Sequence, residues 1–96
     1  MAEGSADRPS SAASIWRTLS AWPEGYFVAV FAGRRYGVTR SVHAGGRSMK
    51  LYAEELGGAD RISLNIYRPV GGDPALKPCE MPADKVTAFV LGAELG

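Results

Sequence analysis

One segment of this sequence alternates strictly between two kinds of side chain. In residues 61–68, RISLNIYR, aliphatic residues take every second position, and polar or aromatic residues lie between them: Ile62, Leu64 and Ile66 alternate with Ser63, Asn65 and Tyr67. A period of two is typical of a β-strand whose faces meet different surroundings. Because a lone strand cannot bury its aliphatic face, the segment requires a sheet with one covered face and one exposed face.

Residues 26–43 supply two further strands, YFVAVF and RYGVTRSVH, with the aromatic and β-branched composition that favours a sheet. We expect Gly33 and Arg34 to form the turn between them, because glycine in the first central position suits a type II′ hairpin. That turn would pair Phe31 with Tyr36.

The next segment, residues 48–56, has good helix formers and is open to two interpretations. As a helix it would carry Lys50 near its N-terminus and two glutamates near its C-terminus, which opposes the helix dipole. As a strand after a two-residue turn at residues 45–46, it would pair Val42 with Met49 on the aliphatic face. We therefore predict a strand.

The C-terminal part of the chain predicts an edge strand and a helix. Residues 75–79, ALKPC, contain Pro78, which excludes a central position in a sheet. Pro82 is suited to open a helix. The apolar stripe of that helix, expected to cover the aliphatic face of the sheet, consists of Val86, Phe89, Val90 and Ala93.

At the N-terminus, residues 1–13 are small and polar, and we predict a disordered tail. Ser14 can cap a short helix that runs to Trp22 with one apolar face. The expected architecture is a tail followed by one α+β domain over residues 14–96. That domain is an antiparallel meander of four to five strands, with a short N-terminal helix and a C-terminal helix packed on one face.

The middle of the chain is strongly basic, although the net charge of the whole chain is only +1. Residues 26–53 contain five basic residues and no acidic one: Arg34, Arg35, Arg40, Arg47 and Lys50. Such a segment favours contact with phosphate groups. The alternative is that strands simply carry arginine at solvent-facing positions.

Residues suited to catalysis or metal binding are few. His43 and Cys79 are the single histidine and cysteine, and they lie on different predicted elements without a third orienting group. A zinc site needs about four clustered ligands, and no phosphate-cradling glycine motif occurs. We expect a non-catalytic protein without cofactor or metal. The alternative is a thiol-dependent oxidoreductase using Cys79, which lies just before a helix N-terminus.

The same sequence indicates a cytoplasmic protein that does not enter a membrane. A single cysteine cannot form an internal disulfide. No apolar stretch approaches the length of a bilayer span, and the N-terminus lacks the basic-then-apolar order of a signal peptide.

The polar face of the predicted sheet carries tyrosines among hydroxyl, amide and basic groups. Alternation places on it Thr39, Ser41, His43, Lys50, Tyr52, Ser63, Asn65 and Tyr67. Aromatic rings stack on the bases of single-stranded nucleic acid, and cations contact its phosphates. The alternative is that tyrosine occupies exposed strand positions because of its β propensity. Glu54 on the same face makes the surface less basic.

The segment RRYGVTRSVHAGGRSMKLYAEELGGADRISLNIYR, followed by an apolar helix, resembles the PUR repeat of the Pur-alpha family. The shared features are a basic-aromatic start at residues 34–36, the turn pair Gly46 and Arg47, and strands reading KLYAE and DRISLN. The resemblance implies a PUR/whirly-like fold of four meandering strands and a helix that binds single-stranded DNA and RNA. Residues 70–81 depart from that pattern, and one repeat is present where family members pair two.

Residues 47–96, notably LKPCEMP, are also similar to small uncharacterised bacterial proteins, some labelled peptide methionine sulfoxide reductase. Neither the Gly-Cys-Phe-Trp motif nor the zinc cysteines of those enzymes occur in this sequence. We therefore do not infer that activity.

Taken together, the charge pattern, the polar face and the PUR resemblance predict binding of single-stranded DNA or RNA. The candidate nucleic-acid-binding residues are Arg34, Arg35, Thr39, Arg47, Lys50, Tyr52, Asn65 and Tyr67. The alternative is a protein interaction domain whose basic hairpin meets an acidic partner. We also expect a homodimer, because the first strand puts apolar residues on the outer face. The helix at residues 14–22 would cover part of that patch and a second subunit the rest.

Overall fold

The computed structural model describes residues 3–79 and 81–95, with side chains from residue 12 onward. Its elements are α1 (Glu3–Ser20), β1 (Gly25–Phe31), β2 (Arg34–His43), the 3₁₀ turn η1 (Ala44–Gly46), β3 (Ser48–Glu55), β4 (Arg61–Tyr67), β5 (Ala75–Pro78), α2 (Ala83–Gly92) and β6 (Glu94–Leu95). Among these described residues, no helix has the length and apolar character needed to cross a membrane.

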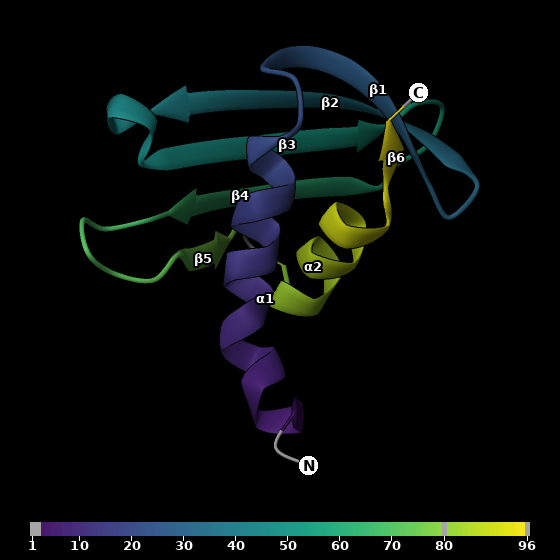
Figure 1. Cartoon of the computed structure of the whole chain (residues 1–96). Helices are drawn as coiled ribbons and strands as arrows, with labels where there is room; N and C mark the ends of the chain where they lie inside the picture. Colours follow the sequence, from purple (N-terminus) through teal and green to yellow (C-terminus); the bar gives the residue numbers. More distant parts are fainter. Residues whose placement is uncertain (1–2, 80, 96) are drawn as a thin grey trace.

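The strands form one antiparallel sheet in the order β5-β4-β3-β2-β1-β6 (Figure 1). The predicted α+β class is confirmed, and β5 lies at the sheet edge as expected. The sheet has six strands rather than four or five. The additional strand is β6, where Leu95 pairs with Ala29 and Glu94 with Val30. A strand of two residues has no readable periodicity.

Strand β3 confirms the choice of strand over helix. It pairs with β2 in the predicted register, with Val42 opposite Met49. The connection itself differs, because η1 and Arg47 make a longer turn in place of the two-residue turn. Gly45 and Gly46 both have positive φ there, at 66° and 92°, a conformation that favours glycine.

The hairpin between β1 and β2 corrects one prediction. Its two-residue turn consists of Ala32 and Gly33, with φ of 54° and 77°, so Phe31 pairs with Arg34 instead of Tyr36. Positive φ at both central positions is the primed-turn geometry that matches strand twist. The sequence pattern missed it because alanine rarely adopts positive φ. The register shifts by an even number of residues, so every side chain keeps its predicted face.

Both helices lie on one face of the sheet, called here the inner face (Figure 1). From α2, the predicted stripe residues Val86, Phe89 and Val90 are buried against the sheet, and Pro82 is the helix N-cap. Phe89 lies at the centre of an aromatic cluster, with its ring centroid 5.0 Å from that of Tyr36. The edge-to-face arrangement of these rings stabilises the core beyond the area that they bury.

Helix α1 begins at Glu3, well before the predicted start at Ser14, so it includes most of the predicted disordered tail at residues 1–13. Residues 1–2 of that tail lie outside the described part of the chain. The alanines of the segment have the highest helix propensity. Downstream, the predicted apolar residues are buried in the core: Ile15, Leu19 and Trp22. The helix therefore packs on the inner face, and the expectation that it covers the outer face of β1 is wrong.

Arg40 is the one charged side chain buried in the core among the described residues, with only 7% of its surface exposed. Its Nε donates a hydrogen bond of 2.7 Å to the carbonyl oxygen of Leu19, at the C-terminal end of α1. A cation at this position complements the negative end of the helix. Its Nη1 is buried without a hydrogen-bond partner among the described residues.

Candidate nucleic-acid interface

With both helices on the inner face, the opposite or outer face of the sheet is left without a helical cover (Figure 1). Three neighbouring rows of side chains cross it from β2 towards β5, because residues paired across antiparallel strands share a face. The first row contains Thr39, Tyr52 and Ser63, the central row contains Ser41, Lys50, Asn65 and Lys77, and the last row contains His43, Ser48 and Tyr67.

The central row presents an amide between two ammonium groups. Asn65 pairs with Lys50 of β3 on one side and with Lys77 of β5 on the other. Both lysines are exposed and Asn65 is half-buried. The Asn65 Nδ2 donates to the Cys79 Sγ at 3.6 Å, which orients the amide. A phosphate and a base edge that lie side by side would both find partners in this row.

Tyrosines lie on either side of the central row. Tyr67 is 47% exposed. Tyr52 is half-buried, and its hydroxyl lies 3.4 Å from the Glu54 Oε1, to which it donates. Tyr52 of β3 pairs with Ser63 of β4, and Tyr67 lies four residues further along β4. Strand geometry therefore separates their Cα atoms by about 14 Å. The rings are too far apart to hold one base between them, so each offers a separate stacking surface.

The structure brings together Thr39, Lys50, Tyr52, Asn65 and Tyr67 of the predicted site residues. Arg47 precedes Ser48 along the chain and therefore lies one position outside the last row. Arg35 lies on the outer face but far from this cluster, opposite Val30. Arg34 alternates to the other side, where its Nη1 lies 3.7 Å from the Glu55 Oε1 in an ion pair.

Lys77 is the residue of this surface that sequence reasoning missed. Its neighbour Leu76 is half-buried whereas Lys77 is exposed, the alternation of a strand with one covered face. That parity was readable in residues 75–79. The loop at residues 70–74 leaves the pairing register between β4 and β5 undetermined from sequence. Nothing in the sequence therefore assigned Lys77 to the row of Lys50 and Asn65.

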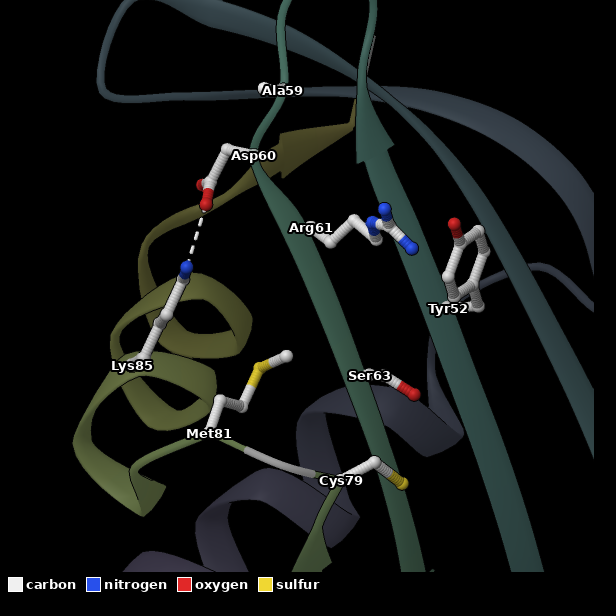
Figure 2. A pocket seen from close by; sticks show the side chains of 8 residues that line it. All are labelled: Tyr52, Ala59, Asp60, Arg61, Ser63, Cys79, Met81 and Lys85. Atoms are coloured by element: carbon white, nitrogen blue, oxygen red, sulfur yellow. Dashed lines mark hydrogen bonds and ion pairs between the residues drawn. The ribbon is translucent and has the colours of Figure 1, made fainter.

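A pocket of about 530 Å³ opens beside the N-terminal end of β4 (Figure 2). It is lined by Tyr52, Ala59, Asp60, Arg61, Ser63, Cys79, Met81 and Lys85. Within it, the Lys85 Nζ donates to the Asp60 Oδ1 at 2.6 Å, and the Tyr36 hydroxyl donates to the Oδ2 at 2.7 Å.

The pKa values of Asp60 and Tyr36 are both shifted from their usual values. The hydrogen bonds from Lys85 and Tyr36 lower the pKa of Asp60 below its usual value. Burial, together with the bond to Asp60, raises the pKa of Tyr36 to about 12. Asp60 and Lys85 are therefore engaged with each other at this end of the pocket.

Cys79 lies at the other end of this pocket, beside Ser63 (Figure 2). His43, the one histidine, is on β2, three strands away across the sheet, and its Nε2 is 2.9 Å from the Ser41 Oγ. The structure therefore does not bring the thiol and the imidazole together. Within the described part of the chain, no three His, Cys, Asp or Glu side chains cluster as metal ligands would.

Comparison of the chain with protein-family models, with curated proteins and with solved structures finds no match. The similarity to the PUR repeat stays a prediction, and the functional argument depends on the geometry of the outer face.

Proposed function

We propose that this protein binds single-stranded DNA or RNA on the outer face of its sheet, without catalysing a reaction. The observation that carries the proposal is the central row of Lys50, Asn65 and Lys77, with Tyr52 on one side and Tyr67 on the other. Stacking platforms beside cations are the recurring elements of single-strand recognition.

The spacing of the tyrosines defines how a strand would lie. Stacked bases follow one another at about 3.4 Å along a duplex strand, whereas about 14 Å separates the Cα atoms of Tyr52 and Tyr67. The two rings would therefore hold non-adjacent bases of an unstacked strand. The nucleotides between them would cross the central row, where Lys50 and Lys77 meet phosphates and Asn65 meets a base edge.

The same surface is poorly suited to a duplex. The described part of the outer face has no helix that could enter a major groove and read base edges there. In a duplex the flat faces of the bases are already stacked on one another, so the tyrosine rings would have no surface to contact. We therefore expect preference for single strands over duplexes of the same sequence.

The test is substitution of the two rings, Tyr52→Ala and Tyr67→Ala, with binding measured on a fluorescent single-stranded oligonucleotide. Each change should weaken binding by ~1–3 kcal/mol, the usual worth of a stacking platform. Leu56→Ala is the control, because Leu56 is an exposed apolar residue just after β3 and outside the three rows, whereas Tyr26 pairs with Thr39 and so continues the first row onto β1. Parental affinity in both variants, with melting temperatures unchanged, would contradict the proposed site.

We also propose that the partner at the opposite edge is a second copy of the chain. Strand β6 pairs only with Ala29 and Val30, which leaves the first half of β1 without a strand partner on that side among the described residues. Tyr26 is exposed in that half of β1, and Val30 and Leu95 are exposed where β1 pairs with β6. Antiparallel pairing of two such edges would cover them and join two outer faces. Sedimentation at high micromolar concentration should give a dimer, and a monomer would rule it out.

A further inference from the structure

Two arginines face each other at the end of the β3–β4 ladder. Ser48 and Tyr67 form its last pair, and the next positions outward are Arg47 and Arg68, whose backbones are joined by a 2.8 Å hydrogen bond from the Arg68 N–H to the Arg47 carbonyl oxygen. Like charges at opposed positions destabilise a sheet. Both side chains are exposed, and neither forms an ion pair within the described part of the chain. An anion between them would remove the repulsion.

Arg68 is held in place by an aromatic ring from α1. Its guanidinium carbon lies 5.4 Å from the centroid of the Trp16 ring, within cation–π range. Trp16 and Arg68 line a pocket of about 440 Å³ together with Arg17 and Asp73. Asp73 is the one acid of that lining, against two arginines.

A second cleft, of about 390 Å³, brings the two opposed arginines together. It is lined by Arg47, Arg68 and the loop of Pro69, Val70, Gly71 and Gly72. Guanidinium groups bind phosphate oxygens in pairs of parallel hydrogen bonds, and one group that packs on a ring loses less freedom when it does so. The cleft thus has the donors of a phosphate site, with one of its arginines already oriented.

We propose that this cleft, named here the arginine cleft after Arg47 and Arg68, binds the terminal phosphate of the nucleic acid that lies on the outer face. The identity of this ligand rests on the proposed function. The cleft lies at the end of the sheet, one residue beyond Ser48 and Tyr67 of the last row. Arg68 turns there towards Trp16 of α1, on the inner-face side, so the end of a nucleic-acid strand on the outer face would pass over the end of the sheet to reach the cleft. A terminal monoester carries about −1.5 to −2 charges at neutral pH. Two opposed guanidinium groups match that charge better than the single charge of an internal diester.

The test compares three forms of one single-stranded oligonucleotide: with a 5′-phosphate, with a 3′-phosphate, and with hydroxyl groups at both ends. One phosphorylated form should bind the parent protein about tenfold more tightly than the hydroxyl form, the effect of one charge-assisted hydrogen bond. Arg68→Gln and Arg47→Gln should each abolish this difference. Arg35→Gln, which changes an exposed arginine at the other end of the sheet, should preserve it.

A second probe separates this proposal from the proposed function. Inorganic pyrophosphate, added without any oligonucleotide, should shift the NMR signal of the Trp16 indole in the parent and in Arg35→Gln, but not in Arg68→Gln. That result supports the arginine cleft even where no oligonucleotide binds. Equal affinity for all three oligonucleotide ends, or an indole shift that persists in folded Arg68→Gln, would overturn it and would leave the tyrosine site standing. Thermal melts establish folding, and Arg47→Gln gives an independent variant that does not disturb Trp16.

Discussion

The Tyr36 hydroxyl donates a 2.7 Å hydrogen bond to the Asp60 Oδ2, and this bond links the buried side of β2 to the residue that precedes β4. Lys85 of α2 donates to the other carboxylate oxygen of Asp60 at 2.6 Å. One half-buried carboxylate therefore connects two strands and the C-terminal helix. The fold depends on this residue more than its position in a turn would indicate.

Asp60→Asn should lower the free energy of unfolding by about 1–3 kcal/mol, because Lys85 loses its charged acceptor and the buried Tyr36 hydroxyl is left with a poorer one. Urea denaturation checks the value. Asp73→Asn, in the exposed loop before β5, is the matched control and should change stability by less than about 0.5 kcal/mol. Equal stability of the two variants would show that the Asp60 contacts contribute nothing.

The pH dependence of stability follows from the two perturbed groups. The pKa of Asp60 is lowered on folding, so its contribution is present above its unfolded pKa and is lost as pH falls through the folded pKa. The pKa of Tyr36 is raised from 10.0 to about 12, so its contribution is present below pH 10 and is lost as pH rises towards 12. When the free energy of unfolding is measured by urea titration at several pH values, Asp60→Asn should reduce its loss at acidic pH. Tyr36→Phe should reduce its loss at alkaline pH. Losses that are unchanged in both variants would refute the assignment.

Arg40→Met should leave the protein within about 1 kcal/mol of the parent, or make it more stable. Replacing a buried charge by an apolar group of similar volume is often neutral or stabilising, and the change also removes the buried Nη1 that has no partner among the described residues. The Leu19 carbonyl oxygen would still accept a hydrogen bond, because the Trp22 N–H also donates to it at 3.1 Å. A loss above about 2 kcal/mol in a thermal or urea melt would show that Arg40 is a required anchor of α1.

Cys79→Ser should leave nucleic-acid binding unchanged. The thiol accepts one weak hydrogen bond from Asn65, which a serine hydroxyl can replace. Binding assays on the variant, with a thiol-reactivity assay on the parent, check this expectation. An activity that disappears in folded Cys79→Ser would instead favour the thiol-dependent enzyme.

Much of the sheet was predictable because its strands alternate over many residues. The pattern of Ile62, Leu64 and Ile66 identified β4, and the glycines at residues 45–46 led to the observed pairing of β2 with β3. The β1–β2 turn was predicted wrongly because it depends on Ala32 in a conformation that alanine rarely adopts.

The candidate site was only partly predictable, for a similar reason. Tyr52, Tyr67 and Lys50 follow from strand parity, which is a local property. The place of Lys77 beside Asn65, and the contact of Arg68 with Trp16, depend on how a loop and a helix return to the sheet. Such contacts between distant segments leave no local pattern in a single sequence.

The central claim is tested most directly by titrating single-stranded and duplex oligonucleotides of one sequence against the parent protein at several salt concentrations. The account predicts binding to the single strand, weaker binding to the duplex, and a logarithmic salt slope of about −0.7 for each phosphate contact. Lys50→Gln and Lys77→Gln should each reduce that slope by about 0.7. No binding to the single strand at low salt, or equal binding to the duplex, would contradict the account and favour an acidic protein partner for the basic hairpin.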